Sequence, residues 1–521
     1  MDCENTFPEE KEFVVTNKRN GILIAYLNLA LGMVVNIFLT PMLISSLGDV
    51  DYSLYKVIQS FAGPLSMFNL GISTIVTRSI VQFATREDYT ERDKKNTMAH
   101  AMLASGVMAL VVCMAGLIMC RSIPRIYGES YSVENLALGQ KVFLVFLLST
   151  VLHMMTDAFS GCLVGHERFT VNSLVQFSGT LLKIVLLVLL VLLGTNALWI
   201  ACVDLLVSLA KFLFSAVYAT FFLHETPRFY YFDRKKLTEI ILFGAAILLQ
   251  AIVNQVNNNV DTMILGAYVS NKAIITMYTS ALTIYAIYNS LISVIASFFL
   301  PKATRLVTQN ASGRELTDFV IGPGRFQAVL ATACIFGFAL CGQNFISVWI
   351  GDKYSDAYWI TLMLMIPVTI PLVENVMISV LDAALKRMYR SVTLVIMALL
   401  NVVASLVLVR LLGFWGTAIG TVMSLLIGHG VLMNAYYAKT FRLQVFRMFY
   451  SIFRGILPAG LAAAILCLPL TLLLPNTIGF FLVKGIGFML FYGLFLQLFG
   501  LNPSEKKAVR SWLKRDNRGA A

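Results

Sequence analysis

The residues best suited to chemistry in this chain are ionisable side chains inside long apolar stretches. They are Asp157, Lys183, Asp204, Lys211, Glu374 and Lys484. Each costs a few kcal/mol, about 2.5 to 3.5, if charged at the centre of a bilayer. One interpretation is internal pairing, for instance of Asp204 with Lys183. The other is functional: the lysines line a cavity that attracts an anion, and Asp157, Asp204 and Glu374 are candidates for coupling to a cation gradient.

A run of amides opens the central apolar stretch, QAIVNQVNNNVDTMILGAYVSNKAIITMY. Gln250, Asn254, Asn258 and Asp261 recur every three or four residues, which places them on one stripe of a helix. A polar stripe on a membrane helix requires a polar partner or water. It indicates either hydrogen bonding between helices or a hydrated pathway.

The first two apolar stretches carry a similar pattern. Asn28 and Asn36 lie eight residues apart and share a helix face, and Arg78 closes the second stretch. Gly63-Pro64 is expected to kink or loosen that second helix. Lys56 falls near its outer end, where snorkelling to the interface explains a lysine.

Catalytic chemistry has no support in the sequence. There is no Walker A pattern, no His, Cys, Asp and Glu set with metal-ligand spacing, and no long extramembrane loop for an active site. We therefore expect no catalytic residue, no metal and no cofactor. The eight cysteines are interpreted as small core residues. His166 and Glu225 fall in loops, where exposure to solvent is expected.

Composition predicts an all-α, polytopic membrane protein. The chain is 58% hydrophobic and 13% charged, whereas soluble domains carry about 25% charged residues. Apolar runs long enough to span a bilayer number about fourteen. They are 21–45, 52–77, 97–120, 140–163, 172–194, 197–222, 238–264, 274–300, 324–345, 357–384, 391–412, 414–436, 455–474 and 477–499.

The loops have a strong charge asymmetry. Of the 40 Lys and Arg residues, 30 fall on the side of the N-terminus and 5 on the opposite side. Positive charge concentrates in cytoplasmic loops, so both termini are predicted to be cytoplasmic. The same excess explains the net charge of +12 without a nucleic-acid partner.

Hydropathy and a weak internal repeat, which places Asn36 on Asn259, predict two six-helix lobes. The predicted segments are a cytoplasmic N-terminus (1–20), an N-lobe (21–222), an inter-lobe linker (223–237), a C-lobe (238–436), helices 13 and 14 (437–499) and a cytoplasmic amphipathic tail (500–521). The tail pairs apolar residues with lysines and arginines, which suits the anionic membrane surface.

Three stretches resemble the multidrug/oligosaccharidyl-lipid/polysaccharide exporter superfamily, and within it the bacterial polysaccharide flippases of O-antigen and related repeat units. They are LTPMLISSLGDVDYSLYKVIQSFAGPLSMFNLGISTIVTR from Leu39, DTMILGAYVSNKAIITMYTSA from Asp261, and WIGDKYSDAYWITLMLMIP from Trp349, which GFWGTAIGTVMS follows from Gly413. The similarity runs over most of the first twelve predicted spans.

The resemblance implies alternating access and a flippase in the bacterial inner membrane. Its implied substrate is undecaprenyl-diphosphate-linked oligosaccharide, moved from the cytoplasmic to the outer leaflet among membrane lipids, with glycan polymerase and glycosyltransferases as further partners. A diphosphate needs cationic groups in place of water, and the implied contacts are Arg78, Lys183, Lys211 and Lys484. The amides Asn28, Asn36, Asn254 and Asn258, with Asp261, suit sugar hydroxyls.

Three alternatives stay open. The multidrug antiporter branch of the same superfamily often has a carboxylate in its first helix, and the first span here has none. A membrane-bound glycan polymerase or ligase needs a sizeable external loop, which is missing. A scaffold that recruits glycosyltransferases without transport is opposed by the polarity of the predicted cavity.

Overall fold

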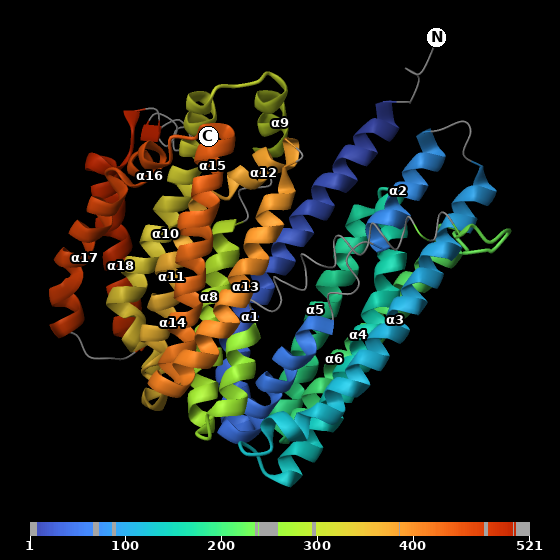
Figure 1. Cartoon of the computed structure of the whole chain (residues 1–521), viewed down its shortest axis with the longest axis horizontal. Helices are drawn as coiled ribbons and strands as arrows, with labels where there is room; N and C mark the ends of the chain where they lie inside the picture. Colours follow the sequence, from blue (N-terminus) through green and yellow to red (C-terminus); the bar gives the residue numbers. More distant parts are fainter. Residues whose placement is uncertain are drawn as a thin grey trace, which may run out of the picture. The chain divides into compact units, whose positions relative to one another are not determined.

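The computed structural model describes residues 8–65, 72–85, 90–234, 238, 259–293, 299–384, 386–473, 478–503 and 505–506. Throughout these residues the regular structure is helical, with no strand (Figure 1). The predicted all-α class is therefore confirmed. A chain this apolar hydrogen-bonds its backbone within helices because hydrocarbon offers no other partner.

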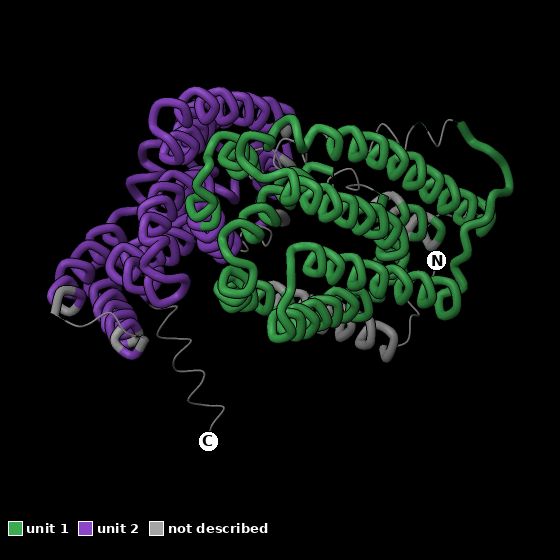
Figure 2. The backbone as a smooth tube through the Cα atoms, turned by 90° about the horizontal axis from the view of Figure 1, so that it is seen from below, with its two compact units in different colours: residues 1–276 green, residues 277–521 purple. Residues whose placement is uncertain are grey.

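The chain divides into two compact units, Met1–Thr276 and Met277–Ala521, which Figure 2 colours separately. The sequence instead places a linker between lobes at 223–237. Residues 235–237 and 239–258 lie outside the described part of the chain. The division into six-helix lobes therefore stays a prediction.

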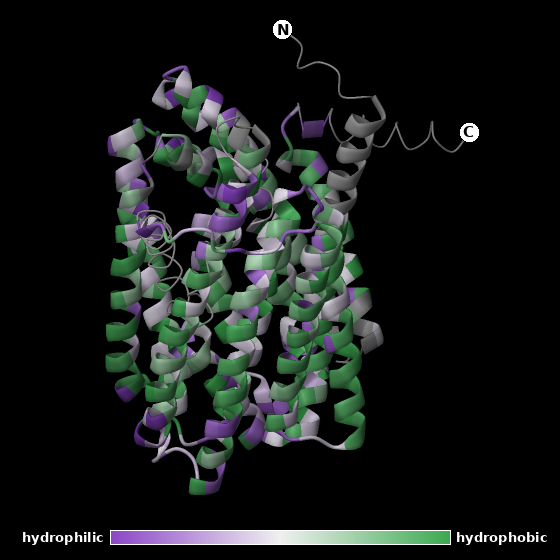
Figure 3. Ribbon diagram, turned by 90° about the vertical axis from the view of Figure 1, so that its right-hand side faces the viewer, coloured by the Kyte–Doolittle hydropathy of each residue, from purple (hydrophilic) through white to green (hydrophobic). Residues whose placement is uncertain are grey.

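Eleven helices among the described residues are long and apolar enough to cross a membrane. The first, Ala30–Leu65, includes parts of two predicted spans, and ten others match one predicted span each. Helix α8 (Lys272–Ser293) covers most of the predicted span 274–300, whereas the span 238–264 is described only from residue 259. In Figure 3 apolar residues, shown in green, occupy most of the length of these helices, as a lipid-facing surface requires.

Unit 1 begins with a long bent helix. Its elements are α1 (Pro8–Ala62), α2 (Ile72–Thr85), α3 (Glu91–Tyr127), α4 (Val133–Gly165), α5 (Phe169–Leu193), α6 (Ala197–Val217), the π-helical η2 (Tyr218–Phe222) and helical residues 259–268. Gly48 breaks α1 into two arms with φ 68° and ψ 176°, within the predicted turn 46–51. The α-helix ends at Ala62, immediately before Gly63-Pro64, where the sequence predicts a kink or a loosening within the span 52–77.

Close packing holds the helices of unit 1 together. Helix α4 contacts α2, α3 and α6, and the first helix packs along α5. Gly161 of α4 permits one of these approaches, since a Cβ there would lie 2.5 Å from the backbone oxygen of Ser73 in α2. The hydroxyl of Thr77 donates to the Gly161 carbonyl across the same contact at 2.9 Å.

Glu225, after η2, is buried at 2% exposure, which corrects the expectation that it is solvated. Its carboxylate pairs with Lys94 of α3 and accepts a hydrogen bond from His166 Nε2 at 2.8 Å. Burial opposes its ionisation, but the hydrogen bonds from His166 and Lys94 hold the pKa of Glu225 below its ordinary value. The loop folds back because this carboxylate finds cations within unit 1.

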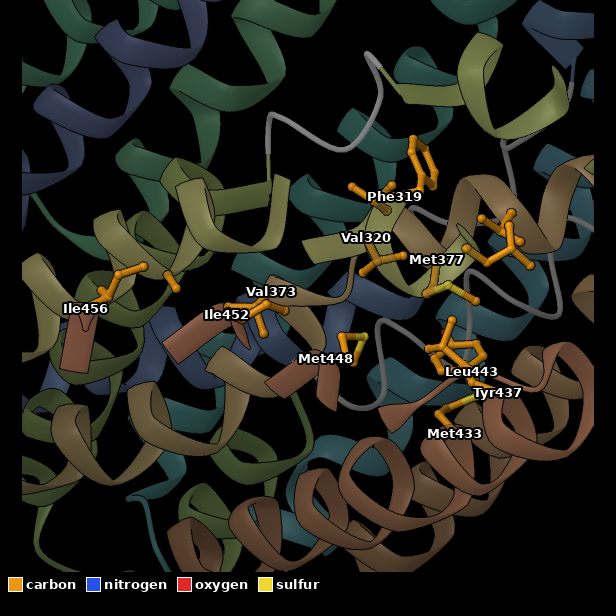
Figure 4. Close-up of a cluster of buried hydrophobic side chains, with 14 of the residues drawn as sticks. Phe319, Val320, Val373, Met377, Met433, Tyr437, Leu443, Met448, Ile452 and Ile456 are labelled. Carbon is orange, nitrogen blue, oxygen red and sulfur yellow. The ribbon is translucent and has the colours of Figure 1, made fainter. Parts of the chain in front are cut away.

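Unit 2 is built around α10. Its elements after α8 are α9 (Leu300–Thr308), α10 (Gly313–Ile350), η4 (Asp352–Tyr354), α11 (Ala357–Val373), α12 (Val376–Ala383), α13 (Arg387–Leu412), α14 (Phe414–Leu425), η5 (Leu426–Met433), α15 (Asn434–Phe441), α16 (Val445–Phe453), α17 (Ile456–Leu473), α18 (Ile478–Phe495) and η6 (Leu496–Gly500). Helix α10 contacts α11, α16, α17 and α18. Figure 4 shows the apolar cluster that results, with Val320 of α10, Val373 of α11 and Ile452 of α16 among its members.

Several helices extend beyond the predicted spans. Helix α10 begins at Gly313, eleven residues before the predicted span 324–345, after a capping box in which Ser312 and Glu315 satisfy each other's backbone N–H groups. Hydropathy misses this extension because its first turns carry charged residues. The sequence signal was the Ser-x-x-Glu spacing.

Arg325 of α10 ties the end of unit 2 together and is only 3% exposed. Its guanidinium donates to the carbonyls of Ser451 at 2.7 Å, Arg454 at 3.1 Å and Gly500 at 2.7 Å. It also pairs with Glu505, Nε to Oε1 at 2.7 Å. Terminal helix carbonyls lack partners within their own helix, so one buried cation satisfies the ends of α16 and η6.

We predict that Arg325→Ala destabilises the folded protein by about 3 kcal/mol, because Glu505 and three carbonyls lose their donor. Thermal unfolding of the detergent-solubilised protein measures the change as a lowered midpoint. Arg314→Ala is the matched control, since Arg314 is an exposed residue of the same helix. Equal midpoints for the two variants would contradict this role of Arg325.

Candidate functional site

Unit 1 contains a polar cavity of about 670 Å³. Its walls come from α1, α4, α5, α6 and the helical residues from 259 onward. The polar and charged lining residues are Asn36, Gln59, Ser149, Thr150, His153, Thr180, Lys183, Asp204, Ser208, Lys211 and Asn259. Thus Asn36, Lys183, Asp204 and Lys211, which the sequence singles out separately, line one space.

Lys183 of α5 forms an ion pair with Asp204 of α6. The side chain of Lys183 is 38% exposed and that of Asp204 is 17% exposed, so both can reach the cavity. The pairing that the sequence suggests as a structural explanation therefore does occur. It does not remove the lysine from the cavity.

Lys211 of α6 has a neutral partner, because its Nζ donates to Oε1 of Gln176 in α5 at 3.0 Å. Gly179 of α5 makes room for this contact: a Cβ there would lie 2.0 Å from Cε of Lys211. The lysine stem crosses the helix at the one position without a side chain. Gln176 carries no charge, so the negative charges that act on Lys211 are those of Asp204 and Asp157.

Hydroxyl and amide groups fill the remaining lining. Ser149 of α4 and Ser208 of α6 are hydrogen-bonded at 2.8 Å, and Ser149 also donates to the Asp204 carbonyl at 3.4 Å. The side chain of Asn36 is exposed in the cavity. Such groups can donate and accept, and therefore suit a polyhydroxylated ligand.

Lys56 of α1 is a further cation near this cavity. It interacts electrostatically with both Lys183 and Asp204, so it belongs beside this charge cluster. Its Nζ also lies over the rings of Tyr52 at 5.6 Å and Tyr55 at 6.0 Å. The sequence interpretation of Lys56 as a lysine near the outer interface did not indicate these neighbours.

Of the other predicted site residues of unit 1, Asn28, Asp157 and Asp261 do not line the cavity. Asp261 is buried at 4% exposure, while its neighbour Asn259 faces the cavity. Asn28 lies further along α1, and Asp157 of α4 interacts electrostatically with Lys211. Asn254, Asn258 and the side chain of Arg78 lie outside the described residues.

Glu374 and Lys484 belong to unit 2 and do not line this cavity. Lys484 of α18 is 3% exposed. Glu374 is 2% exposed and follows the last residue of α11, where the predicted continuous span 357–384 is broken. Seven cysteines are described, all as free thiols, and the described residues include no cluster of His, Cys, Asp and Glu that could bind a metal.

The lining residues of the cavity are suited to binding a ligand. Two lysines and one aspartate give its lining a net positive charge, and amides and hydroxyls surround them. Burial strengthens such charges relative to water. The arrangement can therefore hold an anion together with hydroxyl groups.

A family model described as "Polysaccharide biosynthesis protein" matches residues 18–307, which is more than half of the chain. The chain belongs to this family. The polysaccharide-exporter resemblance of the three sequence stretches is thereby confirmed. No curated protein sequence matches the chain.

Solved structures show the same fold. The lipid II flippase MurJ, in an inward closed conformation, aligns with a TM-score of 0.72 at 14% identity, covering 92% of this chain and 98% of that one. An inward-facing multidrug resistance MATE transporter of the MOP superfamily aligns with a TM-score of 0.59 at 16% identity, covering 81% and 99%. An outward-facing transporter of that kind gives 0.52 at 17% identity, covering 83% and 96%. The family and the fold both identify the chain as a multi-pass membrane protein of the MOP superfamily.

We predict that a double-mutant cycle of Lys183→Met and Asp204→Asn yields a coupling of about 1 kcal/mol, because the pair is only partly screened by solvent. The measured quantity is the thermal midpoint of each variant in detergent. The cycle of Arg447 and Asp318, a pair with side chains 38% and 51% exposed, is the control and should give a coupling near zero. Additive effects of Lys183→Met and Asp204→Asn would show that the two side chains do not interact.

Proposed function

We propose that this protein is a flippase for undecaprenyl-diphosphate-linked oligosaccharide. In this proposal the cavity of unit 1 carries the head group from the cytoplasmic to the outer leaflet by alternating access. The polyprenyl chain stays in lipid, and no covalent chemistry takes place. The observation that carries the proposal is the placement of Lys183 and Lys211 beside one polar cavity, in a chain of a polysaccharide biosynthesis family.

Charge explains how the cavity would take and release its ligand. The ion pair with Asp204 keeps Lys183 compensated while the cavity is empty. A diphosphate carries more negative charge than one carboxylate and can accept from both lysines, so it competes with Asp204 for Lys183. Once the ligand leaves, the aspartate restores the pair.

Sugar groups would find partners in the same lining. Asn36, Gln59 and Asn259 supply amides, and Ser149, Thr150, Thr180 and Ser208 supply hydroxyls. Amides and hydroxyls together can hydrogen-bond sugar hydroxyls that point in different directions, and so can replace the water around them.

The proposed setting is the bacterial inner membrane, with both termini in the cytoplasm because of the charge asymmetry of the loops. Glycosyltransferases would then supply the substrate on the cytoplasmic side, and a glycan polymerase would receive it outside. A cation-coupled multidrug antiporter remains the alternative. The net positive lining opposes it, since cationic drugs would be repelled.

We predict opposite effects from the two members of the ion pair on binding of undecaprenyl diphosphate to the purified protein. Lys183→Ala or Lys211→Ala removes a charge-assisted contact worth about 1.5 to 3 kcal/mol, so affinity should fall roughly 10- to 100-fold. Asp204→Asn removes the competing carboxylate, so affinity should rise. Fluorescence or calorimetric titration in detergent measures the three affinities.

Lys141→Ala is the matched control, because Lys141 is an exposed residue of α4 outside the cavity. Surface glycan in a deletion strain that carries each variant provides the readout in cells, with protein level measured alongside. Normal export by Lys183→Ala and Lys211→Ala would remove both lysines from the site. Efflux of cationic dyes with unchanged surface glycan would favour the antiporter.

A further inference from the structure

Glu374 is the most isolated ionisable group that the structure describes in unit 2. It lies at the break between α11 and α12 and is 2% exposed. Its chain neighbour Val373 and the nearby Val376 and Met377 are each fully buried in the apolar cluster of unit 2. Figure 4 shows Val373 and Met377 within that cluster, together with Met433 and Tyr437.

Neither carboxyl oxygen of Glu374 accepts a hydrogen bond from any described residue, and no ion pair to it occurs among them. Asn434 at the start of α15 is beside it, but the geometry falls short of a hydrogen bond. An ionised carboxylate buried without donors costs several kcal/mol, and in practice such a group takes up a proton instead. The neutral acid is therefore the stable form at this position.

The neighbouring amide of Asn434 is held by a hydrogen bond of its own. Asn434 is 5% exposed, and its Nδ2 donates to the His429 carbonyl at 2.9 Å. A carbonyl can only accept, so this bond fixes the orientation of the amide. Oδ1 of Asn434 is then an acceptor without a donor in the described structure.

The surrounding titratable groups supply no counter-charge. Tyr437 of α15 interacts electrostatically with Glu374, and Arg390 of α13 acts on Tyr437 and on His429 of η5. Tyr436 of α15 also acts on Tyr437. The positive charge of Arg390 therefore acts on Tyr437 and His429. A phenol side chain carries no positive charge that could compensate a carboxylate.

We infer that Glu374 is a proton-binding site in unit 2, occupied in this conformation and emptied when the break between α11 and α12 opens to water. The backbone is irregular on both sides of the site, since α11 ends there and Asn434 directly follows the π-helical η5. Such irregular turns are frequent at functional sites and leave room for a second arrangement. The claim that Glu374 couples proton movement to transport rests on the proposed function. The claim that Glu374 binds a proton does not.

This inference separates three carboxyls that the sequence treats alike. Asp204 is compensated by Lys183, and Asp157 interacts with Lys211, so both have a cation that stabilises the charged form. Glu374 has none among the described residues. A sodium ion is the competing occupant, because three acceptor oxygens stand without donors here.

Infrared difference spectroscopy tests the protonation directly. The purified protein carrying ¹³C-labelled glutamate is compared with Glu374→Gln at neutral pH. We expect a carbonyl band of a protonated carboxylic acid in the wild type that is absent from the variant. A difference spectrum with carboxylate bands alone would overturn the inference. Asn434→Ala keeps Glu374 and is expected to shift the same band, so the test holds even if Glu374→Gln fails to fold.

Coupling is tested in proteoliposomes that contain undecaprenyl diphosphate-linked sugar. A pH gradient should stimulate flipping by the wild type and leave Glu374→Gln unstimulated, while the affinity of the variant for undecaprenyl diphosphate stays unchanged. Stimulation retained in the variant would overturn the coupling role. Loss of the infrared band on adding sodium at fixed pH would overturn the proton in favour of a cation. Loss of binding by the lysine variants, by contrast, concerns the proposed function alone.

Discussion

The cost of an ionised side chain away from water governs the polar features of this protein. A carboxylate or ammonium group in a low-dielectric medium needs a counter-charge, a set of hydrogen bonds, water, or a change of protonation state. Lys183 and Asp204 meet the requirement by pairing at the edge of a cavity. Arg325 meets it with three carbonyls and Glu505. Each solution fixes two or more helices relative to one another within its unit.

The two units use charge for different purposes. Unit 1 keeps Lys183 and Lys211 beside an open polar space, so their charge is available to a ligand. In unit 2 two ionisable groups are enclosed: Arg325 is 3% exposed and Glu374 is 2% exposed. A cavity that recognises an anion and a separate buried carboxyl that holds a proton are the two components that a coupled carrier requires.

The fold could be predicted largely from hydropathy, because apolar runs of bilayer length have few alternatives to a spanning helix. The ends of α3 and α10 could not, since their first turns carry charged residues outside those runs. The cavity was only partly predictable. The cost of burying charge identified Lys183, Asp204 and Lys211, but Gln176 and Gly179, which position Lys211, carry no signal until the helices are packed. The place of Lys56 beside Lys183 and Asp204 likewise follows only from the packing of α1 against α5 and α6.

The most direct test of the account is an experimental structure of the protein with undecaprenyl diphosphate bound. We expect the diphosphate in the cavity of unit 1, within hydrogen-bonding distance of Nζ of both Lys183 and Lys211. We also expect the carboxylate of Asp204 to have separated from Lys183. A diphosphate bound elsewhere, with the Lys183–Asp204 pair intact, would contradict the account.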